Sequence, residues 1–277
     1  MDEVPASLNY LAPGSTRNLR YVASNAVLST TAFAPFTVSV GDGRPRRGEF
    51  TLDASGFTLL DHRSAVTNFR DEDELASRYV AEGMALVAGV TGADHVVSLG
   101  WVLRSAAATR GAGRAPGDEV HVDMHPYSAA ARFAEIHEKD GVPGKVFKRA
   151  LCTSLWRTFS PPPQDWPLAV CDYRSTDDAE GLPNVMIMVD KLPRPDEVPE
   201  VVVVAPEQQA GTVFPFNPAH RWWYFPGMHA GEALLLKLCD TDHSVAWRAP
   251  HSAFRDPCVT PPHSRESVEL RTVAFFY

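Results

Sequence analysis

The stretch that decides the fold is 151–159, LCTSLWRTF, whose apolar and β-branched residues are typical of a buried strand. Runs of the same kind follow it to the end of the chain, at 168–171, 185–189, 201–204, 222–225, 233–238 and 268–276. Proline-containing turns separate several of these runs, as expected between short strands. The second half of the chain is therefore predicted to be rich in β-strands.

Helical patterns occur before this β-rich half. Residues 71–89 show a helical apolar spacing that starts at the N-cap candidate Asp71, with Glu74 three residues later as in a capping box and Gly83 as a weak point. A strand candidate follows at 95–99, and a second helix is predicted at 128–139. Helices followed by many short strands predict a mainly β fold, an antiparallel barrel or jelly roll with a helical buttress.

The first fifty residues read as extended strands and turns, with a turn near 41–43 and a strand candidate at 48–52. No linker divides the chain. We therefore expect one domain over residues 1–277, with residues 1–50 packed on it as an extended segment.

Composition excludes several classes of function. The 277 residues are 44% hydrophobic and 22% charged, and their formal charge is −8 without a polybasic run, which argues against sequence-independent nucleic-acid binding. The aliphatic run 201–205 is far too short for a membrane span, and the acidic N-terminus shows no secretory signal. Four cysteines without a CxxC pair indicate buried thiols in a reducing compartment. A cytoplasmic protein is expected.

The chemistry is indicated by residues 118–126, DEVHVDMHP. Residues two apart in a strand share a face, so His121 and Asp123 would present an imidazole and a carboxylate side by side. Those are two members of a 2-His-1-carboxylate facial triad, which holds Fe(II) and leaves positions open for a co-substrate and O₂. On its own, the His-x-Asp pattern also fits an exposed pair at a strand end.

The C-terminal region can complete such a site. His251 could supply the third ligand, and fourteen residues later Arg265 and Ser267 share one face by the same alternation. A guanidinium beside a hydroxyl suits the capture of a carboxylate, such as the distal carboxylate of 2-oxoglutarate.

Several segments occur together in one order along the chain: 121–123 (HVD), 156–157 (WR), 166–175 (WPLAVCDYRS), 223–226 (WYFP), 232–237 (EALLLK), 251–257 (HSAFRDP) and 265–267 (RES). In this order and spacing the chain resembles the hydroxylase/desaturase family of secondary metabolism that includes the AsaB-like oxygenases of fungi and the 7α-hydroxylation component of the cephamycin pathway. The resemblance covers the chain from about residue 120 to its C-terminus.

The resemblance implies a double-stranded β-helix oxygenase that uses Fe(II), 2-oxoglutarate and O₂ in secondary metabolism such as antibiotic biosynthesis. His121, Asp123 and His251 would be the metal ligands and catalytic residues, and Arg265 the co-substrate anchor, with Ser267 and Arg157 also at the co-substrate. The substrate would be a small metabolite that is hydroxylated, desaturated or oxidatively cyclised. A protein partner or a homo-oligomer stays open. The chain departs from the family pattern at His125, Ser154 and Thr158.

Other readings of the same residues remain. A cupin-like hydrolase or isomerase would use the same three ligands on Zn²⁺ or Mn²⁺ and would not need Arg265, and a non-catalytic partner subunit would need no metal. His125 and His263 are weaker ligand candidates, and His220 fits a structural role. Arg174 and Arg271 are weaker rivals of Arg265, since Arg271 reads as a solvated strand residue.

Overall fold

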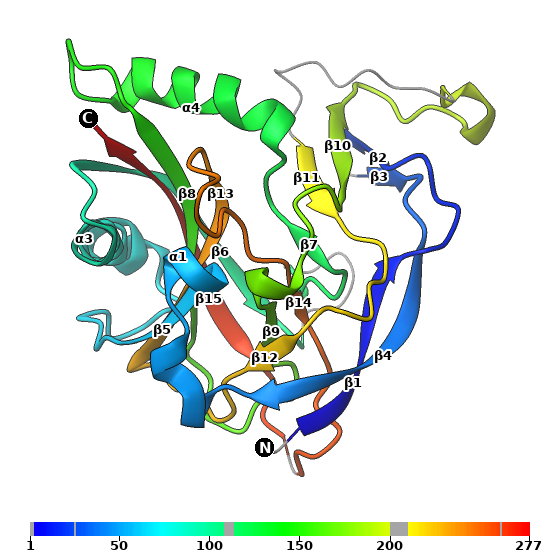
Figure 1. The fold of residues 1–277 in the computed structure, drawn as a ribbon, viewed down its shortest axis with the longest axis horizontal. Helices are drawn as coiled ribbons and strands as arrows, with labels where there is room; N and C mark the ends of the chain where they lie inside the picture. Colours follow the sequence, from blue (N-terminus) through cyan, green and yellow to red (C-terminus); the bar gives the residue numbers. More distant parts are fainter. Residues whose placement is uncertain (1–2, 25, 108–113, 200–209, 261) are drawn as a thin grey trace.

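Two β-sheets face each other and enclose the main hydrophobic core (Figure 1). The computed structural model describes residues 3–24, 26–107, 114–199, 210–260 and 262–277. Inward side chains from both sheets meet in this core, for example Trp156 and Leu236 of one sheet with Val170 and Trp223 of the other. This is the mainly β architecture that the sequence predicts.

The smaller sheet has five antiparallel strands in the order β5 (Phe57–Asp61), β13 (Glu232–Asp240), β8 (Arg149–Thr158), β15 (Glu266–Phe276) and β6 (His95–Ser105). Alternation along each strand divides its side chains between the two faces. On β15, Val273 and Phe275 point into the main core, whereas Leu270 and Ala274 belong to a second core on the outer face.

The larger sheet has ten short strands, and it carries the N-terminal segment. Its order is β1 (Glu3–Leu11), β4 (Phe33–Asp42), β12 (Trp222–Tyr224), β9 (Leu168–Cys171), β14 (His251–Ala253), β7 (His121–Val122), β11 (Ala210–Val213), β10 (Leu182–Met188), β2 (Leu19–Ala23) and β3 (Ala26–Ser29). The N-terminal strands lie at both ends of this sheet: β4 pairs with β1 and, in parallel, with β12, whereas β2 pairs with β3 and, in parallel, with β10.

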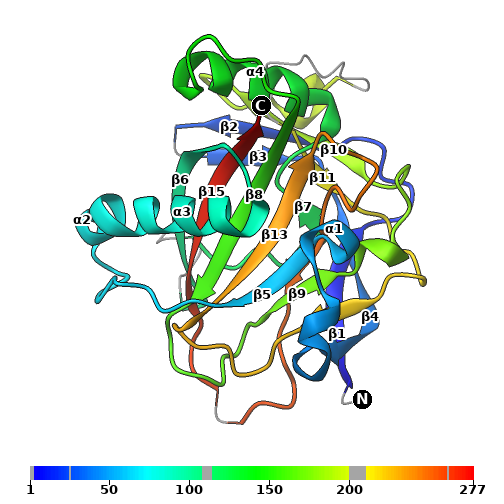
Figure 2. The same ribbon diagram turned by 60° about the vertical axis from the view of Figure 1, so that its left-hand side comes forward.

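The predicted buttress is a helical segment made of α2 (Glu72–Glu74), a π-helical turn (Leu75–Tyr79) and α3 (Val80–Thr91). Figure 2 shows α3 across the outer face of the five-stranded sheet. Gly83 permits this close approach, because a Cβ there would lie 2.3 Å from Leu270 Cδ2. The weak point in the helical pattern is thus the contact with the sheet.

The expected capping box is half confirmed. The carboxylate of Asp71 accepts hydrogen bonds from the backbone N–H groups of Asp73 and Glu74, as an N-cap should. The carboxylate of Glu74 does not return to Asp71. It accepts from the backbone N–H groups of Thr67 and Asn68 and fixes the loop before the helix.

The second predicted helix is α4 (Pro126–Asp140), which begins two residues earlier than expected because His125 caps it. The strand expected at 48–52 is wrong. Pro45 lies in the first turn of a 3-10 helix (Arg44–Glu49), and the hydroxyl of Thr51 caps α1 (Leu52–Ser55). Two further 3-10 helices lie at Tyr173–Ser175 and Pro195–Glu197.

The other predicted strands are present with shifted ends, and the candidate at 201–204 lies outside the described residues. None of the helices in the described part of the chain is long and apolar enough to cross a membrane.

Candidate metal centre

Two neighbouring strands bring the predicted ligands together. His121 on β7 is the direct cross-strand partner of His251 on β14, and their ring centroids are 4.5 Å apart. Asp123 follows β7 on the same face as His121. Its Oδ1 lies 3.8 Å from Nε2 of His121, and its Oδ2 lies 3.9 Å from Nε2 of His251. One donor atom from each residue falls within 4.8 Å of the other two. The carboxylate–imidazole distances of 3.8 and 3.9 Å are short enough for a divalent ion with bonds of about 2.0–2.2 Å to bridge.

Backbone hydrogen bonds set the tautomer of both imidazoles. Nδ1–H of His121 donates to the carbonyl oxygen of Glu119 at 2.7 Å, and Nδ1–H of His251 donates to that of Ala249 at 3.0 Å. Each ring therefore presents the lone pair of Nε2 to the common point. Such contacts orient histidine ligands in metal sites.

The charges favour the ligand forms of these groups. Burial alone would raise the pKa of Asp123, but Arg271, His121 and His251 outweigh it and lower that pKa to about 2. Burial, reinforced by His121, lowers the pKa of His251 to about 4. At neutral pH the site thus offers an ionised carboxylate and a neutral His251 imidazole, as metal binding requires.

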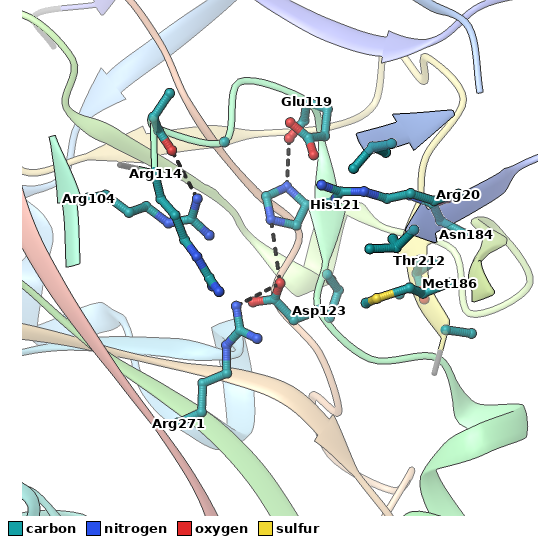
Figure 3. A pocket seen from close by; sticks show the side chains of 17 residues that line it. Arg20, Arg104, Arg114, Glu119, His121, Asp123, Asn184, Met186, Thr212 and Arg271 are labelled. Atoms are coloured by element: carbon teal, nitrogen blue, oxygen red, sulfur yellow. Dashed lines mark hydrogen bonds and ion pairs between the residues drawn. The ribbon is translucent and has the colours of Figure 1, made fainter. Parts of the chain in front are cut away.

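Two cavities meet at His121. The outer one has a volume of about 590 Å³ and is bordered by His121, Asp123 and Arg271 (Figure 3). The inner one is a narrow cleft between the sheets that reaches from His121 and His251 to Arg265. Ser154 and Trp156 line this cleft, so the departure from the family pattern at Ser154 lies at the site itself.

Arg265 and Ser267 carry buried polar groups that could bind an anion. The Arg265 side chain is buried, with Nη1 donating to the carbonyl of Trp166 at 2.8 Å and the guanidinium over the Trp156 ring. Within the described residues, its Nε and the buried Oγ of Ser267 have no hydrogen-bond partner. A carboxylate could satisfy both groups. Burial, with Arg104 adding to it, lowers the pKa of Arg265 to about 9, so the guanidinium keeps its charge at neutral pH.

The structure does not bring Arg157 to this site. Its side chain leaves β8 on the outer face, opposite to Ser154 and Trp156, and donates to the carbonyl oxygens of His62 and Ala230. The guanidinium also lies over the rings of Phe69 and Tyr79. The expectation that Arg157 reaches the co-substrate is corrected, because strand alternation sends it under the helical buttress.

The sequence predicts Arg271 to be a solvated strand residue, and the structure corrects this prediction. Nη2 of Arg271 lies 3.1 Å from Oδ1 of Asp123 and 2.9 Å from Oε1 of Glu269. The alternation that pairs Arg265 with Ser267 on one face of β15 extends to Glu269 and Arg271, and this signal could have found both.

The weaker ligand and anchor candidates lie outside the metal centre. Nδ1 of His125 accepts from the backbone N–H of Tyr127 at the start of α4, His263 is exposed, and Arg174 pairs with Asp172 at 2.8 Å. His220 contacts Tyr10 and Glu180, which confirms its structural role.

Comparison with known proteins identifies the family. The model of the oxidoreductase/YMDC permease-like domain matches residues 8–275. The Fe(II)/2-oxoglutarate-dependent dioxygenase nvfI of Aspergillus novofumigatus is 30% identical over 251 residues, 88% of this chain and 84% of the relative. The chain belongs to this family of dioxygenases. The hydroxylase/desaturase efuI of Hormonema carpetanum is also 30% identical, over 99% of this chain and 95% of the relative.

A solved structure supports the same assignment. The iron and alpha-ketoglutarate-dependent endoperoxidase NvfI superposes with a TM-score of 0.82 and 25% identity, over 99% of this chain and 98% of that chain. The hydroxylase/desaturase asaB of Aspergillus flavus, a relative of the kind expected from the sequence, is 33% identical over 86% of this chain and 80% of its own length. The jelly-roll fold and the enzyme class predicted from the sequence are both confirmed.

Proposed function

We propose that His121, Asp123 and His251 hold Fe(II), and that Arg265 with Ser267 binds the distal carboxylate of 2-oxoglutarate in the inner cleft. The observation that carries this proposal is the convergence of one carboxylate and two correctly oriented imidazoles within 4.8 Å. When bound, the iron supplies O₂ activation coupled to the oxidative decarboxylation of 2-oxoglutarate to succinate and CO₂.

The side chains prepare the site for this chemistry. Three protein ligands on one side of an ion leave positions open on the other. The contact with Arg271 keeps the Asp123 carboxylate ionised and oriented. At the far end of the cleft, burial beneath Trp156 strengthens the attraction of Arg265 for a carboxylate, because water screens the charges less there.

The reaction is the oxidation of a small secondary metabolite by hydroxylation, desaturation or oxidative cyclisation. Support comes from the names of the relatives, which are a dioxygenase, a hydroxylase/desaturase and an endoperoxidase. The resemblance to the cephamycin-pathway component points the same way. One oxygenase domain over residues 1–277 and a cytoplasmic location belong to the same proposal, and the four cysteines, all free thiols, fit a reducing compartment.

The test is anaerobic loading with Fe(II), followed by 2-oxoglutarate and then air. Wild-type protein should bind one iron, develop a metal-to-ligand absorption band with 2-oxoglutarate, and release succinate in air even without substrate. The His251→Ala variant should show neither band nor succinate. A bound metal without either signal would favour the cupin-like hydrolase or isomerase. Failure to bind metal would favour a non-catalytic partner subunit.

A further inference from the structure

The outer cavity is lined by both apolar and cationic side chains. Strand alternation turns Val22 of β2 and Met186 of β10 toward the cavity, where Val27 and Val122 join them. Four arginines line the same cavity, with two carboxylates, Glu119 and Asp123. In a chain with a formal charge of −8, such a gathering of arginines focuses positive potential on one small space.

Two of these arginines are already paired. Arg271 contacts Asp123 and Glu269, and Arg104 lies 3.3 Å from Glu269 while donating to the carbonyl of Ala115 at 2.9 Å. These contacts hold the two guanidiniums against β15 and the metal site.

Arg20 and Arg114 are different. In the parts of the chain that the structure describes, neither guanidinium has a hydrogen bond or an ion pair, although the carboxylate of Glu119 lines the same cavity. Figure 3 shows both side chains directed into the cavity, Arg20 from β2 and Arg114 from the segment before β7. An arginine in a cavity that makes no hydrogen bond or ion pair can donate charge-assisted hydrogen bonds to a bound anion.

The co-substrate does not account for these two arginines. Its proposed anchor, Arg265, lies in the inner cleft, which contacts neither Arg20 nor Arg114. Among the residues that the structure describes, the two cavities share Arg104, Gly117 and His121 and no others. A molecule in the outer cavity would sit beside His121 and Asp123, which is where the substrate of the metal centre must lie.

We propose that the substrate is a small molecule with an apolar body and an anionic oxygen group, a carboxylate or a phosphate ester, held by Arg20 and Arg114. This inference rests on the proposed function, since it places the substrate beside the iron. The apolar body lies against Val22, Val27 and Met186. Paired contacts from guanidiniums then fix the end of the substrate that does not react.

The experiment is anaerobic calorimetric titration of the protein loaded with Fe(II) and 2-oxoglutarate. The probes are 3-phenylpropionate, 2-phenylethyl phosphate and the neutral 3-phenylpropionamide. At least one anion should bind about tenfold more tightly than the amide, as expected for charge-assisted contacts with arginine. The tighter of the two anions identifies the anionic group.

Variants assign the effect to the two arginines. In the Arg20→Gln/Arg114→Gln double variant, the preference for the anion should fall to about threefold or less, since a neutral amide replaces each charge. Arg63→Gln, which removes an exposed arginine outside the cavity, should keep the full preference. Because Arg20 and Arg114 are exposed and have no hydrogen-bond or ion-pair partner among the described residues, the double variant should remain folded.

The absorption band of 2-oxoglutarate separates the two proposals. If the band never forms, the proposed function fails before any probe is added. If it forms, this inference is overturned by equal affinity for amide and anions, by no binding of either anion at millimolar concentration, or by a preference that survives in the double variant. Displacement of 2-oxoglutarate by the anions would overturn it too, because the two molecules would then share one cavity.

Discussion

Replacement of Arg265 tests the co-substrate site most directly. Its side chain is only 1% exposed, and the hydrogen bond to Trp166 uses Nη1, so the Nε edge of the guanidinium is left for a ligand. Arg265→Ala removes that edge and the positive charge together. Arg265→Lys keeps a charge but loses the planar pairing, because an ammonium group is a point charge without a fork.

The expected loss follows from this geometry. Removing one member of a buried hydrogen-bonded charge pair costs about 2–5 kcal/mol, much of it because the partner charge is left unpaired. For 2-oxoglutarate this means a dissociation constant raised by about 30-fold or more in Arg265→Ala. The loss of one charged hydrogen bond in Arg265→Lys should raise it by about tenfold. Iron affinity should not change, because Arg265 is not among the converging ligand atoms.

The assay is anaerobic titration of the Fe(II) protein with 2-oxoglutarate, read from the metal-to-ligand absorption band. Arg157→Lys is the matched control, since Arg157 is equally buried but lies on the outer face of β8. It should lower the melting temperature and leave 2-oxoglutarate affinity unchanged. The reasoning is refuted if Arg265→Ala binds 2-oxoglutarate like the wild type, and a selective loss in Arg271→Ala would move the anchor to Arg271.

Three further predictions follow from the same contacts. Ala variants of His121, Asp123 and His251 should each lose stoichiometric iron in anaerobic metal analysis, whereas His125→Ala, which alters a helix cap, should keep it; full iron in His251→Ala would exclude that residue as a ligand. Treatment with a chelator should abolish succinate release but leave the far-UV circular dichroism unchanged, because the two apolar cores hold the sheets without the metal; unfolding of the metal-free protein at room temperature would contradict this. Gly83→Ala should lower the free energy of unfolding in urea by about 1–3 kcal/mol, because the added Cβ would crowd Leu270. Gly89→Ala, in the same helix, should raise the free energy of unfolding by about 0.5–1 kcal/mol, because its Cβ meets open space. Equal effects of the two substitutions would show that α3 does not pack closely on the sheet at Gly83.

The three residues of the candidate metal centre could be predicted from the sequence, but their geometry could not. A His-x-Asp pattern places two groups on one face of a strand by local alternation alone. The third ligand depends on which strand lies beside β7, and β14 has only three residues, His251–Ala253. So short a strand carries no periodicity, and its pairing with β7 and β9 comes from the closure of the whole sheet. The sequence therefore offers His251 only as a candidate from the C-terminal region, and the family resemblance is what singles it out.

Faces of strands explain the error at Arg157. The sequence predicts residues 151–159 to be one buried strand. In the structure both faces of β8 are covered, one by the main core and the other by α3. A strand buried on both sides has no polar alternation to show which residues face the site. A buried arginine on such a strand could then face either side. Arg157 faces outward, where it donates hydrogen bonds to the carbonyl oxygens of His62 and Ala230.

The inner face of β15 joins the two halves of the proposed mechanism. Arg265 lines the inner cleft just before the start of the strand, and Arg271 contacts Asp123 farther along it. Glu269 lies between Arg265 and Arg271 on the same face. Its buried carboxylate contacts both Arg271, which pairs with Asp123, and Arg104, which lines both cavities. One strand and the residue that precedes it therefore supply both the proposed co-substrate anchor, Arg265, and the guanidinium that contacts Asp123 in the proposed metal site.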